Sequence, residues 1–100
     1  MIYLQISEFA LKDLESITIW SESKRNGLSF EFELNLEFEL EVIIKNPLAF
    51  QNKYRNVKVR FLNKFPYGIL YIFNQNTILV RRIFHTSQSP KNWYKRLSEI

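Results

Sequence analysis

The stretch "SFEFELNLEFELEVIIKNP", residues 29–47, decides the fold, because its pattern fits both a strand and a helix. Apolar residues occupy every even position from Phe30 to Val42, which is the two-residue period of a strand. A strand of that length would be unusually long, and leucine and glutamate favour a helix. Ser29 can cap the start of such a helix, and the Asn-Pro pair can end it. We therefore predict a helix here.

This helix would carry two apolar stripes on different sides. The first stripe can pack on a sheet and consists of Phe32, Leu36, Leu40 and Ile43. The second stripe needs either a neighbouring helix or a partner protein to cover it, and burial within the fold is the favoured explanation. It consists of Phe30, Leu34, Phe38 and Val42.

A strand and another helix are predicted before this segment. "IYLQI", residues 2–6, alternates apolar and polar side chains, as a short strand does. Ser7 can cap a helix that we expect from Glu8 to Lys24, where basic residues and Gly27 mark its end. The apolar face of this helix carries Ala10, Leu14 and Ile17.

Three strands and a short helix are predicted after the Asn-Pro pair. "VKVRF", residues 57–61, alternates apolar and basic side chains, and "YGILYIF", residues 67–73, is almost continuously apolar, like a central strand. The turn "NQN" leads into a strand over residues 77–85, and a helical turn is expected over residues 91–97. The predicted fold class is α+β, a single domain over residues 1–100. Its element order is β-α-α-β-β-β plus a short C-terminal helix, with a helical hairpin packed on a mostly antiparallel, twisted sheet in two layers.

Length and composition limit the possible functions. One hundred residues with 46% hydrophobic composition suit one hydrophobic core. The lack of cysteine excludes disulfides and thiolate metal sites, and a single histidine disfavours a zinc centre, so we expect no metal and no cofactor. No apolar run reaches the ~18 residues of a membrane span, and the start of the chain does not resemble a signal peptide. We expect a soluble, cytoplasmic protein without a membrane partner.

The charge is distributed unevenly along the chain. Residues 1–50 contain four basic and nine acidic side chains, whereas residues 51–100 contain ten basic ones and only Glu99. This asymmetry is typical of a surface that binds a polyanion or an acidic partner. A small basic protein without a specific ligand explains the charge equally well.

The stretch "RRIFHTSQSPKNWYKR", residues 81–96, contains candidate catalytic residues. Strand alternation places Arg81 and His85 on one face and Arg82 on the other. His85 is the only side chain that ordinarily titrates near neutrality, so it is the candidate acid or base for cleaving a phosphodiester. If the helices cover one face of the sheet, Arg60 can reach the open face and bind phosphate there.

Other side chains in the basic half of the chain can contact a nucleic acid or another target. Tyr94 can stack an unpaired base during a cleavage that needs no metal. A structural role competes for two of the candidates, because a lone histidine at a strand end often hydrogen-bonds a loop and Trp93 can be a core anchor. The candidate target-binding residues are Lys58, Arg82, Lys91, Trp93, Lys95 and Arg96.

Taken together, these segments resemble the RelE/ParE superfamily of toxins from bacterial type II toxin–antitoxin systems. The resemblance rests on "ALKDLESITIW" (residues 10–20), the Asn46-Pro47 pair, "VRFLNKFPYGILYIF" (residues 59–73) and residues 81–96. "FPYGILYIF" followed by "H-T-x-x-x-P-x-x-W" is most similar to the ParE-type plasmid-stabilisation branch.

The resemblance implies a growth-inhibiting toxin that a cognate antitoxin neutralises by wrapping it. ParE-like members poison DNA gyrase, whereas RelE-like members cleave mRNA on the ribosome without a metal. By position, Arg60 is similar to the strand arginine before "FPY", and His85 to a histidine that takes part in RNA cleavage in some members. Relatives often carry arginine shortly after that histidine, where this chain has Gln88, which argues for a thinner cationic cluster.

Three hypotheses follow for the function. The leading one is a toxin that binds DNA gyrase. The second is a ribosome-dependent endoribonuclease in which His85 is the acid or base, Arg60 and Arg81 bind the phosphate, and Tyr94 stacks a base. The third is a degenerate, non-toxic member that only binds its antitoxin. The antitoxin is expected on the second apolar stripe, which consists of Phe30, Leu34, Phe38 and Val42.

Overall fold

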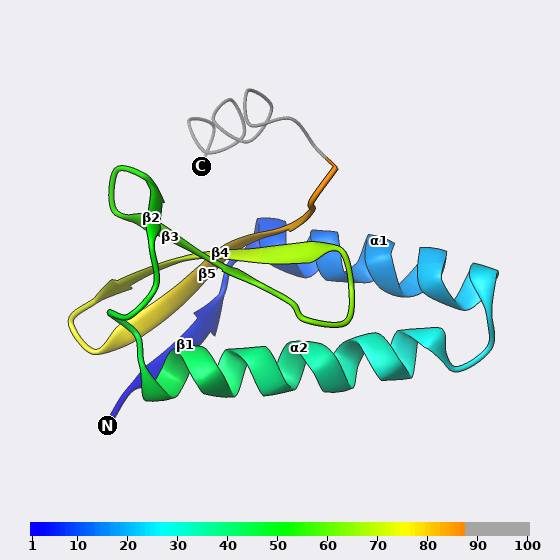
Figure 1. The fold of residues 1–100 in the computed structure, drawn as a ribbon, viewed down its shortest axis with the longest axis horizontal. Coiled ribbons are helices and arrows are strands. Elements are labelled where there is room, and N and C mark those ends of the chain that lie inside the picture. Colours follow the sequence, from blue (N-terminus) through cyan, green and yellow to red (C-terminus); the bar gives the residue numbers. More distant parts are fainter. Residues whose placement is uncertain (88–100) are drawn as a thin grey trace.

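The computed structural model describes residues 1–87, so the helix predicted over residues 91–97 lies outside them. Two helices form a hairpin that packs against one sheet, and the turn between them lies at the right of Figure 1, away from the strands. Neither described helix combines the length and hydropathy that a bilayer crossing requires. The elements are β1 (Tyr3–Ile6), α1 (Glu8–Lys24), α2 (Leu28–Lys45), β2 (Asn52–Tyr54), β3 (Val57–Phe61), β4 (Tyr67–Asn74) and β5 (Thr77–His85).

The sheet has five strands in the order β1-β5-β4-β3-β2. β1 pairs with β5 in parallel, and every other pair is antiparallel. The α+β prediction with a mostly antiparallel sheet is therefore confirmed, while the short edge strand β2 was not predicted. Gln75 and Asn76 both have positive φ angles, of 50° and 60°, as a two-residue hairpin turn requires.

α1 begins where the sequence predicts. The side chain of Ser7 accepts a hydrogen bond from the backbone N–H of Ala10 at 3.1 Å, which satisfies a donor that the first turn leaves unpaired. The same hydroxyl donates to the carbonyl oxygen of Arg81 in β5 at 2.8 Å. Ser7 therefore caps the helix and fastens its start to the sheet.

α2 is a helix, as predicted, but Ser29 does not cap it. The helix begins at Leu28 after Gly27, whose φ of 87° favours glycine. The cap comes from α1, because Glu22 Oε1 accepts hydrogen bonds from the Ser29 hydroxyl at 2.6 Å and from the backbone N–H groups of Gly27 and Ser29 at 3.0 and 3.1 Å. These bonds, above all that from the Ser29 hydroxyl, hold the pKa of Glu22 below its ordinary value.

The main core lies between the helices and the sheet. From α2, Phe32, Leu36 and Ile43 are buried in it, so the first stripe packs on the sheet as predicted. Phe32 meets the rings of Phe65 and Tyr67 edge to face, with centroids 5.5 and 5.4 Å away. The expectation that the fold also buries the second stripe is wrong, because α1 packs along only one flank of α2 and leaves its outer surface open.

A second cluster occupies the other face of the sheet, and it contains Val57, Val59, Leu70 and Phe84. Phe84 lies over Gly68 on the neighbouring strand, and its ring also meets Phe61 edge to face at 6.1 Å. A Cβ at position 68 would lie 2.5 Å from Cζ of Phe84, which is closer than side-chain atoms approach one another. Gly68 is therefore needed to admit this ring.

We expect Gly68→Ala to lower the free energy of unfolding by about 1–3 kcal/mol in urea denaturation, because the added methyl overpacks the site. Phe84→Leu provides the control, since its shorter side chain leaves room for the methyl. In the Phe84→Leu background the cost of Gly68→Ala should therefore be smaller. Equal costs in the two backgrounds would contradict this explanation.

Candidate functional site

Arg60 faces the helices, not the open face of the sheet. Its Nε donates to Oε1 of Glu39 at 2.9 Å, and its guanidinium lies 4.8 Å from the ring centroid of Phe50. Glu39 is completely buried, and its Oε2 also accepts from the backbone N–H of Asn63 at 3.2 Å. The predicted placement of Arg60 on an open cationic face is therefore wrong, although its proposed role in binding phosphate remains a prediction.

The reason lies in the strand alternation of β3 and in the position of Glu39 on α2. Val57 and Val59 point to the far face of the sheet, so Arg60 must point toward the helices. Glu39 follows Leu36 by three residues and precedes Ile43 by four, which places it within the buried stripe. This spacing was the signal in the sequence, but the regular alternation from Phe30 to Val42 does not distinguish Glu39 from the other glutamates at odd positions.

A polar network extends from this ion pair into the loop between β3 and β4. Asn35 Nδ2 donates to Oδ1 of Asn63 at 2.7 Å, and the backbone N–H of Lys64 donates to Oδ1 of Asn35 at 3.2 Å. Asn35 is 5% exposed, so these bonds satisfy a buried amide. α2 therefore holds the loop that carries Lys64.

Arg82 fastens α1 to β5. Its Nε and Nη2 donate to the two carboxylate oxygens of Asp13 at 2.8 and 2.9 Å, and both side chains are 15% exposed. Asp13 Oδ2 also accepts from the backbone N–H of Ile83 at 3.0 Å. Contact between Arg82 and a target stays a prediction, and it would compete with this bidentate pair.

Arg81 sits in an irregularity of β5. Leu70 pairs with Arg82 and Tyr71 pairs with Val80, so Arg81 is an extra residue between the two pairs. Such a bulge interrupts the alternation of side chains, and Val80 and Ile83 accordingly both belong to the helix-side core. The prediction that side chains alternate strictly along this strand is therefore wrong. Alternation no longer shows that Arg81 and His85 lie on the same face.

His85 hydrogen-bonds the loop that follows it. The backbone N–H of Ser87 donates to Nδ1 at 3.0 Å, and the Ser87 hydroxyl lies 2.7 Å from the same nitrogen. Because Nδ1 accepts, we assign the proton of the neutral ring to Nε2. The ring meets Tyr67 edge to face at 5.1 Å, and burial raises the pKa of that phenol. This bond to the following loop is the structural role that the sequence leaves open for a lone histidine at a strand end.

A shallow pocket of about 380 Å³ lies beside His85 against α1, and Trp20 and Tyr67 contribute to its wall. Arg60 does not reach it. Arg60 pairs with Ile69, which pairs with Ile83, so two strand spacings, or about 10 Å, separate the strands of Arg60 and His85. The two side chains also face different helices. The described residues therefore do not bring the predicted catalytic pair together around one phosphate.

The remaining predicted target-binding residues divide into two groups. Lys58 is described, and its Nζ donates to the carbonyl oxygen of Phe50 at 3.0 Å. The others lie outside the described residues and stay predictions. They are Lys91, Trp93, Lys95 and Arg96, and the candidate base-stacking residue Tyr94 of the cleavage hypothesis also lies outside the described residues.

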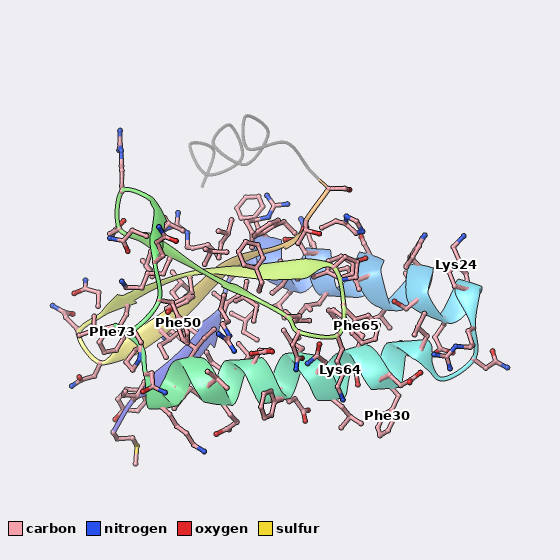
Figure 2. The ribbon with its side chains drawn as sticks, in the orientation of Figure 1. Lys24, Phe30, Phe50, Lys64, Phe65 and Phe73 are labelled. Carbon is pink, nitrogen blue, oxygen red and sulfur yellow. The ribbon has the colours of Figure 1, made fainter. Side chains whose placement is uncertain are left out.

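The second apolar stripe of α2 is largely exposed. Phe30, Leu34 and Phe38 are 62%, 51% and 58% exposed, and Val42 is half-buried. Figure 2 shows Phe30 pointing away from the sheet. These four residues are called the α2 stripe below. Large side chains in a row on the surface are typical of an interaction site.

A groove lies on each side of the α2 stripe, and Leu34 and Phe38 line both. The first, of about 660 Å³, separates α2 from the loop that carries Lys64 and Phe65. The second, of about 540 Å³, lies toward β1 and includes Leu4. The stripe is therefore a ridge between two hollows. Sequence reasoning missed the loop and Leu4, because no local pattern brings them next to α2.

Comparison with known proteins gives both a family match and structural neighbours. A family model described as "ParE toxin of type II toxin-antitoxin system, parDE" matches residues 4–90. A search of curated protein sequences finds no significant match.

Solved structures similar to this chain include the following three, and at these low identities the likeness concerns the fold. One is a chromosomal ParDE toxin–antitoxin system from P. aeruginosa, with a TM-score of 0.76 and 15% identity, covering 87% of this chain and 98% of that one. The isolated E. coli RelE toxin has a TM-score of 0.62 and 13% identity, covering 99% and 98%. The intact E. coli RelBE complex has a TM-score of 0.61 and 13% identity, covering 88% and 100%.

We expect Arg60→Ala to lower the free energy of unfolding by about 3 kcal/mol, because it leaves the buried carboxylate of Glu39 unpaired. Arg25→Ala is the matched control, since Arg25 pairs with Glu31 at 2.6 Å on the surface, and it should cost less than about 1 kcal/mol. Urea denaturation measures both. Losses of similar size would show that the Arg60–Glu39 pair does not stabilise the fold through its burial.

Proposed function

Because the chain belongs to the ParE toxin family of type II toxin–antitoxin systems, as the family model over residues 4–90 shows, we propose that it inhibits growth by binding DNA gyrase. The ParE-type branch is the one that the sequence motifs resemble, and its members poison gyrase. A protein that captures an enzyme needs a complementary surface and no catalytic group of its own. The large exposed side chains of this small fold suit such a role.

The observation that carries this choice is the engagement of Arg60 with buried Glu39. An arginine that stabilises a phosphate must direct its donors at the phosphate, whereas Nε of Arg60 is committed to a carboxylate. Releasing Arg60 would leave a buried charge without its partner. The pairing therefore supports a binding function over cleavage.

The endoribonuclease alternative retains one observation in its favour. His85 lines a pocket whose wall includes Trp20, a side chain that is 51% exposed and able to stack on a base. In the assigned tautomer, Nε2 can donate a hydrogen bond but cannot accept a proton. His85 would have to give up its bond from Ser87 before it could act as a base.

The cognate antitoxin is proposed to cover the α2 stripe. An amphipathic helix can place its apolar residues in the grooves on both sides of this ridge. This stripe is the part of α2 that the fold leaves open, and large apolar side chains are costly to expose to water. The same surface would serve a degenerate, non-toxic member, which needs an antitoxin site only.

We expect the purified chain to inhibit supercoiling by DNA gyrase at micromolar excess, and His85→Ala to inhibit equally well, because the proposal gives His85 no catalytic role. Growth inhibition by either protein should leave cellular mRNA intact. Unaffected supercoiling together with mRNA cleavage that His85→Ala abolishes would replace this proposal with the nuclease. Normal growth on induction of the chain alone would favour the non-toxic member.

We expect Leu34→Asp to prevent neutralisation by the cognate antitoxin, since it places a charge in an apolar contact. Burying that carboxylate should weaken binding at least about 100-fold. Leu11→Asp is the matched control, because Leu11 on α1 is 53% exposed, close to the 51% of Leu34. Co-production and growth assays measure the effect. Equal rescue of both variants would move the antitoxin site elsewhere.

A further inference from the structure

A row of glutamates borders the α2 stripe on one flank. Glu33, Glu37 and Glu41 follow one another at intervals of four residues, so they lie one turn apart along the helix. All three are exposed, and within residues 1–87 none of them forms an ion pair. Their negative charges are therefore available to a partner, although the exposed Lys45, four residues after Glu41, lines the same groove and offsets part of this charge at the end of the row. We call this row the glutamate edge.

Within residues 1–87, the other flank of the stripe carries one cation without an ion pair, Lys64, because the Arg25 and Glu31 side chains that also line this groove pair with each other. Successive residues of a helix are about 100° apart, so Asn35 and Glu37 lie on opposite flanks of Leu34 and Phe38. Asn35 binds the loop that carries Lys64, which places this lysine across the first groove from the stripe. Figure 2 shows Lys64 beside α2. Lys64 is exposed and has no ion pair among the described residues.

We propose that these two edges fix the direction in which a partner helix crosses the α2 stripe. The partner is an amphipathic helix with basic residues along one side of its apolar face and acidic residues along the other. Reversing such a helix end to end exchanges its two sides, which would bring like charges together at both edges. This inference rests on the proposed antitoxin site and adds the charge pattern and orientation of its occupant.

The size of the preference follows from exposed ion pairs. Each such pair strengthens binding by about twofold, and each like-charge contact weakens it by a similar factor. Several such contacts change together when the helix reverses, so one direction should be favoured about tenfold. The preference should largely disappear in ~1 M salt, where screening acts over about 3 Å. The apolar contacts of the stripe should persist under those conditions.

The chain contains no cysteine, so disulfide crosslinking can report the direction. Asn26→Cys and Leu48→Cys place single thiols at exposed positions just before and just after α2. The probes are two stapled helical peptides of about five turns, each with an N-terminal cysteine and the same apolar residues. The first peptide carries lysines along one side of its apolar face and glutamates along the other. In the second peptide the lysines and glutamates exchange sides. Each peptide should crosslink about tenfold better to one of the two thiols, and the peptides should choose opposite ends.

Lys64→Glu combined with Glu37→Lys and Glu41→Lys should exchange the preferred ends for both peptides. Lys12→Glu with Glu15→Lys, on exposed positions of α1, is the charge-changed control and should exchange nothing. Equal crosslinking at both ends would overturn the orientation proposal while leaving the binding site intact. Crosslinking that Leu34→Asp leaves unchanged would instead overturn the site itself. Dimers of the chain that exclude both peptides would identify a second copy as the occupant and would also overturn the proposal.

Discussion

The ion pair between Arg60 of β3 and Glu39 of α2 joins the sheet to the helical layer. A fully buried carboxylate needs an opposite charge and additional hydrogen-bond donors, and Glu39 obtains both from β3 and from the backbone of Asn63. Strand alternation turns the basic side of β3 toward the helices and Val57 and Val59 toward the far face, and the ion pair satisfies the arginine that this orientation turns inward. The bond from Asn63 to Glu39 also draws the following loop onto α2. The orientation of β3, the position of the following loop and the engagement of Arg60 therefore all meet at this ion pair.

The two sides of α2 follow from this arrangement. Its inner side contributes Phe32, Leu36 and Ile43 to the core together with the polar residues that hold the loop. Its outer side carries large apolar side chains that this chain does not cover. A helix that is amphipathic in the usual sense would have a polar outer surface. α2 instead combines apolar and charged rows there, which is the composition of a surface that meets another protein.

The regular elements could be predicted from the sequence because their signals are local. The capping serine of α1, the end of that helix at Lys24, and the strands of residues 57–61 and 77–85 follow from propensity, periodicity and turn residues. The features that escaped prediction depend on contacts between distant segments. Glu22 reaches across the hairpin to cap α2, and the bulge at Arg81 appears only when β5 is aligned with β4. For the same reason Arg60 and His85, the residues proposed to act together in cleavage, looked convergent in sequence but face different helices in the fold.

The contact between α1 and β5 also covers part of the backbone edge of β5. β1 covers β5 only as far as Val80, and beyond it an open strand edge would offer its backbone groups to any extended chain. The Ser7 hydroxyl donates a hydrogen bond to the carbonyl oxygen of Arg81, and the Asp13 carboxylate accepts one from the N–H of Ile83. The first two turns of α1 therefore cover the part of this edge that no strand within residues 1–87 pairs with. A small member of this toxin family with large apolar side chains on its surface is in this way protected from pairing edge to edge with its own copies along β5.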